Sequence, residues 1–85
     1  MANYRVSVAA SVIKEIRAIP KKDRQRITFR MQSLASDPRP SGCEKLSGEH
    51  RYRVRQGDYR ILYSIDDSTE MVDIVKVAHR REVYR

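Results

Sequence analysis

The chain has 85 residues, of which 40% are hydrophobic and 34% charged, and its formal net charge is +7 with an isoelectric point near 10.0. A chain of this length buries only a small core, so we expect residues 1–85 to form one small domain. The positive charge favours nucleic acid, an anionic surface or an acidic protein as partner, and does not by itself choose among them.

Cysteine usage and hydropathy exclude several classes of protein. Cys43 is the single cysteine, which excludes an intrachain disulfide and a cysteine-based zinc site. No apolar run approaches the roughly 20 residues of a membrane span, and Met1–Arg5 lacks the apolar core of a signal peptide. We therefore expect a soluble cytoplasmic protein with no membrane partner. The acidic residues show no metal-ligand spacing, so neither metal nor cofactor is predicted.

The first part of the chain predicts a strand followed by two helices. Alternation of Tyr4, Val6 and Val8 with polar residues indicates the strand. A helix is predicted over residues 9–19, and Pro20 ends it and can begin the next, over residues 21–35. The apolar faces of the two helices are expected to comprise Val12, Ile13, Ile16, Ile19, Ile27, Met31 and Leu34. The basic residues of the second helix most simply form a solvated outer face.

The most informative stretch is a predicted β-hairpin. Residues 51–55 alternate strictly between arginine and apolar side chains, and Gly57-Asp58 fits a two-residue turn with glycine at its first central position. That register places Arg55 opposite Arg60, Val54 opposite Ile61 and Tyr52 opposite Tyr63. Like charges facing each other across a ladder destabilise it, whereas a phosphate bound between two guanidiniums is strongly held. We therefore interpret the Arg55–Arg60 pair as functional.

The last strand completes the expected architecture. Residues 71–78 are apolar on both faces, which is typical of a central strand. The element order β-α-α-β-β-β predicts an α+β fold in which a helical hairpin packs on one face of a small, mostly antiparallel four-stranded sheet. The other face is expected to carry Arg53, Arg55 and Arg60 together with Lys76, Ala78 and Arg80. Arginines grip phosphates and aromatic side chains stack on bases, so this face suits single-stranded RNA.

Three stretches of the sequence resemble a known family. They are Lys45-Leu46-Ser47-Gly48, the hairpin from Tyr52 to Tyr63 with its Gly57-Asp58-Tyr59-Arg60 centre, and the closing Val77-Ala78-His79-Arg80-Arg81-Glu82-Val83-Tyr84-Arg85. Together they resemble the RelE toxins of the RelE/ParE superfamily, over essentially the whole chain.

The resemblance implies a type II toxin that enters the vacant decoding site of the ribosome and cuts messenger RNA. Cleavage in that family proceeds by attack of the ribose 2′-hydroxyl on the adjacent phosphate, without a metal. The implied partners are the ribosome with its mRNA and a cognate antitoxin, with operator DNA contacted only through the antitoxin complex.

The resemblance also assigns roles to residues of this chain. Arg55, Arg60, Arg80 and Tyr84 are the implied catalytic residues: Arg60 clamps the phosphate, Arg80 lies near the leaving group, and Tyr84 orients the substrate. The implied RNA contacts are Lys45, Arg53, His79 and Arg81. Arg55 stands where some members have a lysine proposed as general base, and an arginine does not deprotonate. The base is therefore left open among Tyr84, His79, a ribosomal group and water.

Two other functions fit the same sequence. A ParE-like inhibitor of DNA gyrase shares the fold, and Arg80 and Tyr84 favour the RelE branch over it. A non-catalytic nucleic-acid-binding module uses the same cations for phosphate affinity alone.

Overall fold

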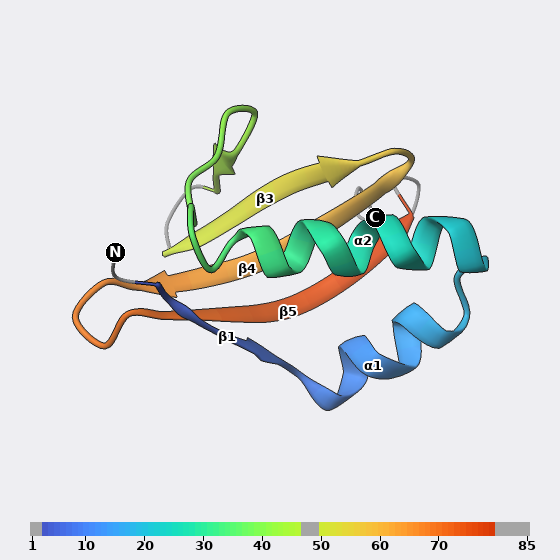
Figure 1. Ribbon diagram of the computed structural model, residues 1–85, viewed down its shortest axis with the longest axis horizontal. Coiled ribbons are helices and arrows are strands. Elements are labelled where there is room, and N and C mark those ends of the chain that lie inside the picture. Colours follow the sequence, from blue (N-terminus) through green and yellow to red (C-terminus); the bar gives the residue numbers. More distant parts are fainter. Residues whose placement is uncertain (1–2, 47–49, 80–85) are drawn as a thin grey trace.

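The computed structural model describes residues 3–46 and 50–79 (Figure 1). Two helices and five strands follow one another in the order β1 (Arg5–Val8), α1 (Ala10–Arg17), α2 (Lys21–Ser33), β2 (Glu44–Lys45), β3 (Arg51–Gln56), β4 (Tyr59–Asp66) and β5 (Met71–His79). The strands form one sheet in the order β1-β5-β4-β3-β2, in which β1 runs parallel to β5 and the other pairs are antiparallel. The α+β class and mostly antiparallel sheet are confirmed, and β5 is an interior strand as predicted.

The strand count differs from the prediction, because the sheet has five strands rather than four. The additional strand, β2, has only two residues, with Glu44 opposite Arg53 and Lys45 opposite Tyr52. Two residues are too few for an alternating pattern to show in a sequence. Its presence matters because it brings the 37–43 loop against the outer edge of β3.

Both helices cover the same face of the sheet. Figure 1 shows α2 in front of β4, and α1 continuing from the end of β1 beside β5; α2 also contacts β3. Their buried side chains share one core with the inward residues of the strands, and this core comprises Val12, Ile19, Ile27, Met31, Leu34, Tyr52, Val54, Ile61, Tyr63, Ile65, Val72, Ile74 and Val77. Ile13 was expected on the apolar face of α1 and is 45% exposed, so that expectation is wrong.

The hairpin of β3 and β4 has the predicted register. Arg55 pairs with Arg60, Val54 with Ile61 and Tyr52 with Tyr63. Gly57 has a φ of +60°, the backbone conformation that a glycine at the first central position of the turn supplies at little cost. The short turn fixes the register, and the register decides which side chains of both strands share a face.

A β-bulge in β5 changes which of its residues face the helices. Tyr63 pairs with Ile74, but the preceding residue, Leu62, pairs with Lys76, so Val75 is the extra residue. Val72 and Ile74 therefore face the core before the bulge, and Val77 faces it afterwards. Lys76 and Ala78 are consequently on the same face as Arg60, away from the helices.

The end of β5 beyond the bulge is held by a side chain of α1. The pairing of β1 with β5 ends at Val8 and Ile74. Further along, the backbone N–H of Val77 donates to Oε1 of Glu15 at 3.0 Å, and Nζ of Lys76 lies 3.2 Å from the other carboxylate oxygen. Glu15 thus accepts a backbone hydrogen bond at an edge that β1 no longer covers.

Candidate RNA-binding and catalytic pocket

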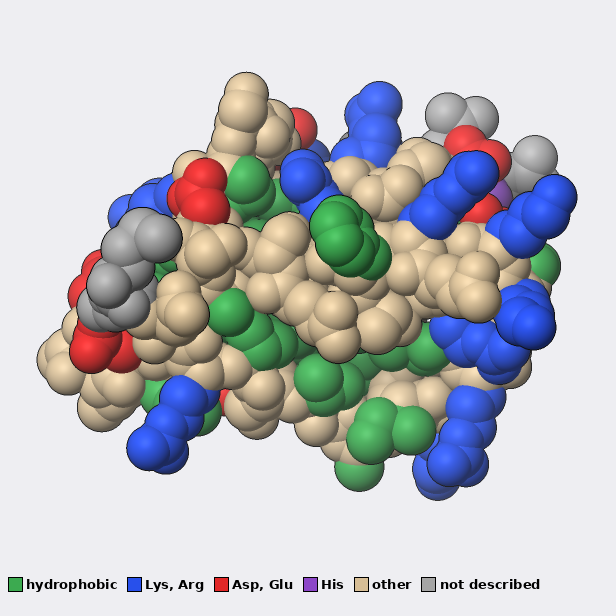
Figure 2. Space-filling view, in the orientation of Figure 1, with side chains coloured by type: hydrophobic (Ala, Val, Ile, Leu, Met, Phe, Trp, Pro, Cys, Tyr) green, Lys and Arg blue, Asp and Glu red, His purple; other side chains and the backbone are tan. Residues whose placement is uncertain are grey.

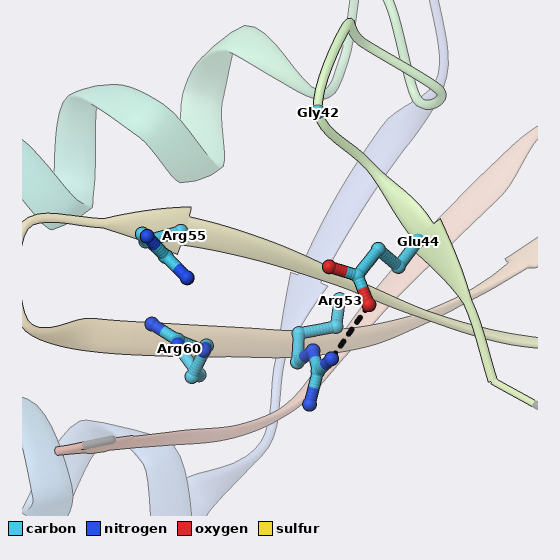
Figure 3. Close-up of a pocket in the computed structure, with 5 residues that line it drawn as sticks. All are labelled: Gly42, Glu44, Arg53, Arg55 and Arg60. Carbon is cyan, nitrogen blue, oxygen red and sulfur yellow. Dashed lines mark hydrogen bonds and ion pairs between the residues drawn. The ribbon is translucent and has the colours of Figure 1, made fainter.

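Three arginines meet on the sheet face opposite the helices. Arg53 and Arg55 are two residues apart on β3 and therefore point to the same side, and Arg60 is the ladder partner of Arg55 on β4. The three side chains lie beside a pocket of about 200 Å³, which is lined by Gly42, Glu44, Arg53, Arg55 and Arg60 (Figure 3). The predicted juxtaposition of Arg53, Arg55 and Arg60 is therefore present in the structure.

The burial of Arg60 sets it apart from the other two arginines. Its exposed fraction is 5%, although it faces away from the helices, and its ladder partner on β5, Ala78, is also buried. Arg55, directly opposite, is exposed. Burying a guanidinium next to another positive charge is costly for a fold. Each guanidinium carries a fork of N–H donors, which is the donor arrangement that suits phosphate oxygens.

Glu44 is the one acidic side chain among the five that line the pocket. Its Oε2 lies 2.6 Å from Nη2 of Arg53, and this ion pair is drawn in Figure 3. The arginine side chain is 16% exposed and the glutamate 63%, so solvent or a ligand can reach the carboxylate. Sequence reasoning missed this residue because its position opposite Arg53 depends on β2, which has no pattern of its own.

Two further predicted site residues, Lys45 and His79, lie away from the three arginines. Lys45 is the ladder partner of Tyr52, so it is on the side of β3 that carries core residues rather than the arginines. His79 pairs with Tyr59, and their rings meet edge to face at 5.5 Å. That places the imidazole on the side opposite Arg60. The predicted positions Arg80, Arg81 and Tyr84 lie outside the described residues.

The loop that leads to Glu44 is fixed at two points on the helix side of the sheet. The guanidinium of Arg39 donates to both carboxylate oxygens of Asp67, at 3.2 and 2.9 Å, and its Nε donates to the hydroxyl of Tyr52 at 3.2 Å. Asp67 also accepts from the hydroxyl of Tyr4 at 2.6 Å. The hydrogen bonds from Arg39 and then from Tyr4 hold the pKa of Asp67 below its usual value.

The second fixed point is the buried side chain of Tyr63. Its hydroxyl donates to the carbonyl oxygen of Pro38 at 2.7 Å and lies 3.3 Å from Sγ of Cys43. Burial, followed by the contact with Cys43, raises the pKa of Tyr63, so the hydroxyl remains a donor at neutral pH. Gly42, with a φ of +88°, then turns the chain towards Glu44.

The basic residues of the helices form a separate surface. Arg17, Lys21 and Lys22 are exposed, and Figure 2 shows lysine and arginine side chains gathered around the connection from α1 to α2.

Neither described helix is long and apolar enough to cross a membrane. Within residues 3–46 and 50–79, no three histidine, cysteine, aspartate or glutamate side chains are grouped in a way that can hold a metal ion.

Comparison with known proteins identifies the family. The sequence profile of the family described as "ParE toxin of type II toxin-antitoxin system, parDE" matches residues 4–84. The chain is 31% identical over 86 aligned residues to Toxin RelE of Mycobacterium tuberculosis, covering 96% of this chain and 87% of that protein. It is 29% identical to Toxin RelG of the same organism, again over 96% of this chain and over 97% of the relative.

Solved structures agree with these sequence matches. The archaeal RelE–RelB complex from Pyrococcus horikoshii superposes with a TM-score of 0.83 at 31% identity, over 94% of this chain and 97% of that one. The toxin–antitoxin complex RelBE2 from Mycobacterium tuberculosis gives a TM-score of 0.81 at 26% identity, over 92% and 99% of the two chains. The chain therefore belongs to the RelE/ParE superfamily of toxins from type II toxin–antitoxin systems, and it is a RelE-type member.

Proposed function

We propose that this toxin is a ribosome-dependent endonuclease that cuts messenger RNA by attack of a ribose 2′-hydroxyl on the adjacent phosphate, without a metal ion. The observation that carries the proposal is the pairing of Arg55 with Arg60 across the hairpin, with Arg53 on the same face of one pocket. As the 2′-oxygen attacks, the phosphate becomes a phosphorane with an additional negative charge. Cations aimed at that charge stabilise the transition state more than the bound substrate.

The proton of the attacking 2′-hydroxyl requires an acceptor, and we assign this role to Glu44. Three of the five residues that line the pocket are arginines, which stay protonated, and Gly42 has no side chain. Glu44 is left as the pocket residue whose side chain can accept a proton. The placement of His79 on the other side of the sheet supports this assignment. In the proposed step the proton passes to the carboxylate, the 2′-oxygen bonds to phosphorus, and the bond from phosphorus to the 5′-oxygen breaks.

Residues of the C-terminal segment complete the proposed site by family resemblance. Arg80 is proposed to lie beside the leaving 5′-oxygen, which takes up a proton from water, and Tyr84 to orient the RNA. Arg81 and His79 are proposed to contact the RNA near this end of the sheet. Lys45 is proposed to contact it at the edge strand.

The proposal is tested by incubating the purified protein with translating ribosomes and mapping the 5′ ends of the mRNA. Cuts in phase with the reading frame, carrying a free 5′-hydroxyl, are expected. Glu44→Gln should slow cleavage by about a hundredfold or more while RNA remains bound, because a general base contributes roughly that factor. Glu70→Gln, the same change in the exposed turn before β5, is the matched control and should cut at the normal rate. A folded wild-type protein that leaves ribosome-bound mRNA intact refutes the proposal.

A second candidate is inhibition of DNA gyrase, which the match to the ParE toxin profile favours. A supercoiling assay separates the two functions. Gyrase inhibition without cleavage of ribosome-bound mRNA identifies the protein as a gyrase inhibitor. A third outcome, salt-dependent binding of RNA with neither activity, identifies a binding module that uses its cations for phosphate affinity alone.

We also propose that the cognate partner is an acidic antitoxin. Both solved structures described above contain a toxin bound to its antitoxin. The net charge of +7 gives an acidic partner a long-range attraction to this toxin. Operator DNA is then contacted through the complex rather than by the toxin alone, and the toxin acts in the cytoplasm, where ribosomes are. Co-expression of the toxin with its cognate antitoxin should relieve growth arrest.

A further inference from the structure

The 37–43 loop passes around the outer edge of β3 from one face of the sheet to the other. Arg39 lies at its beginning and stacks over the ring of Tyr52, a core residue, at 5.2 Å. Gly42 and Glu44, at its end, line the pocket on the arginine side. The loop therefore joins a group of side chains on the helix side to one wall of the pocket.

The anchoring group on the helix side joins segments that are distant in sequence. Arg39 reaches Asp67 in the turn between β4 and β5, which is 28 residues away. Tyr4, preceding β1, reaches the same carboxylate from 63 residues away. The ring of Tyr52 in turn lies 5.9 Å from that of Tyr63, nearly parallel to it, and Tyr63 holds the loop at Pro38. These contacts share partners, so removal of one is expected to weaken the others.

We infer that Arg39 and Asp67 form a latch that holds the 37–43 loop and thereby positions Glu44 in the pocket. Both are positioning residues, because they act on the reaction through Glu44 and are not placed against the RNA. The catalytic part of this inference rests on the proposed function, whereas the mechanical part does not. The latch lies outside the pocket and consists of exposed groups, so loss of it should loosen the loop without unfolding the core.

Cys43 offers a direct probe of the loop. It is the single cysteine, is partly buried beside the hydroxyl of Tyr63 and adjoins Glu44. A small disulfide reagent reacts faster with this partly buried thiol when the loop opens and exposes it further. The rate of thiol labelling therefore reports opening of the loop, in a protein without RNA or ribosomes.

The test compares wild type with Arg39→Ala and Asp67→Asn, with Arg26→Ala on the exposed side of α2 as the matched control. Both latch variants should label about threefold to tenfold faster than wild type and the control, as expected for loss of a bidentate ion pair with further hydrogen bonds. The double variant should label no faster than Arg39→Ala. Thiol labelling at the wild-type rate in both latch variants, with the proteins folded by thermal melting, overturns the latch.

Cleavage on ribosomes tests the link to Glu44. Arg39→Ala should lower kcat more than it raises KM, and in a Glu44→Gln background it should produce no further loss of kcat. A faster-labelling Arg39→Ala variant that cuts normally, or one whose loss of kcat persists in the Glu44→Gln background, overturns the positioning role. If the wild type cuts no RNA at all, the proposed function fails, and the thiol measurement still decides whether the latch exists.

Discussion

The helix-covered face of the sheet and the opposite face take alternate residues from the same strands. Val54 and Ile61 face the helices and are fully buried, while Arg55 and Arg60, each adjacent to one of them in sequence, face the pocket. The first pair gains stability by removing apolar surface from water. The second pair brings like charges together, which costs stability and makes sense for a site that receives phosphate. Adjacent positions in one hairpin thus separate the core from the proposed site.

The largest expected effect comes from the helix-covered face. Ile61→Ala should lower the free energy of unfolding by about 2–5 kcal/mol, because it leaves a cavity in a fully buried position. Chemical denaturation followed by circular dichroism measures this. Retention of wild-type stability in this variant contradicts the assignment of Ile61 to the core. Toxicity should decline only as far as the folded fraction does.

The next effect comes from the neighbouring residue on the other face. Arg60→Ala should reduce mRNA cleavage by about a hundredfold to a thousandfold, as for loss of one donor to a charged transition state. The variant should remain folded, so its loss of cleavage should exceed any loss of folded protein. Growth arrest on induction, compared with thermal melting of the same protein, separates the two effects. If this variant is as toxic as wild type, the pocket is not the active site.

A smaller effect is expected in RNA binding. Arg55→Ala should reduce the slope of log affinity against log salt concentration by about 0.7 for single-stranded RNA, the value for loss of one phosphate contact. Arg26→Ala, on the outer side of α2, should leave the slope unchanged for a short RNA. Fluorescence anisotropy over a salt series provides both slopes. Equal changes in the two variants mean that binding reflects net charge rather than this face.

The smallest effect concerns pH and the anchoring group of the loop. Hydrogen bonds to Arg39 and Tyr4 lower the folded-state pKa of Asp67 below its unfolded value of about 3.9. Its contribution is therefore fully present above the unfolded pKa and is lost as the pH falls through the folded pKa. The melting temperature of wild type should decline more between pH 6 and about 3 than that of Asp67→Asn. Parallel curves for the two proteins indicate that the ion pair adds nothing to stability.

The local features of the hairpin were predictable from its residues. Strict alternation in β3 and the Gly57-Asp58 turn fix which side chains share a face, so the Arg55–Arg60 pair follows from sequence alone. The edge strand β2 was not predictable, because its two residues gain their strand conformation from pairing with β3. Glu44 was missed for the same reason, because it lies on β2. The exposure of Ile13 was missed for another reason: it depends on how α1 packs against β5.

The sequence by itself determined the α+β element order, the hairpin register and the gathering of Arg53, Arg55 and Arg60 on one face, because periodicity and turn chemistry act over a few neighbouring residues. Only the tertiary structure decided three other features: the bulge at Val75 in β5, the approach of Glu44 to Arg53, and the contact of Arg39 with Asp67. Each of these depends on contacts between segments distant in sequence or on a local break in pairing, which no short-range pattern encodes.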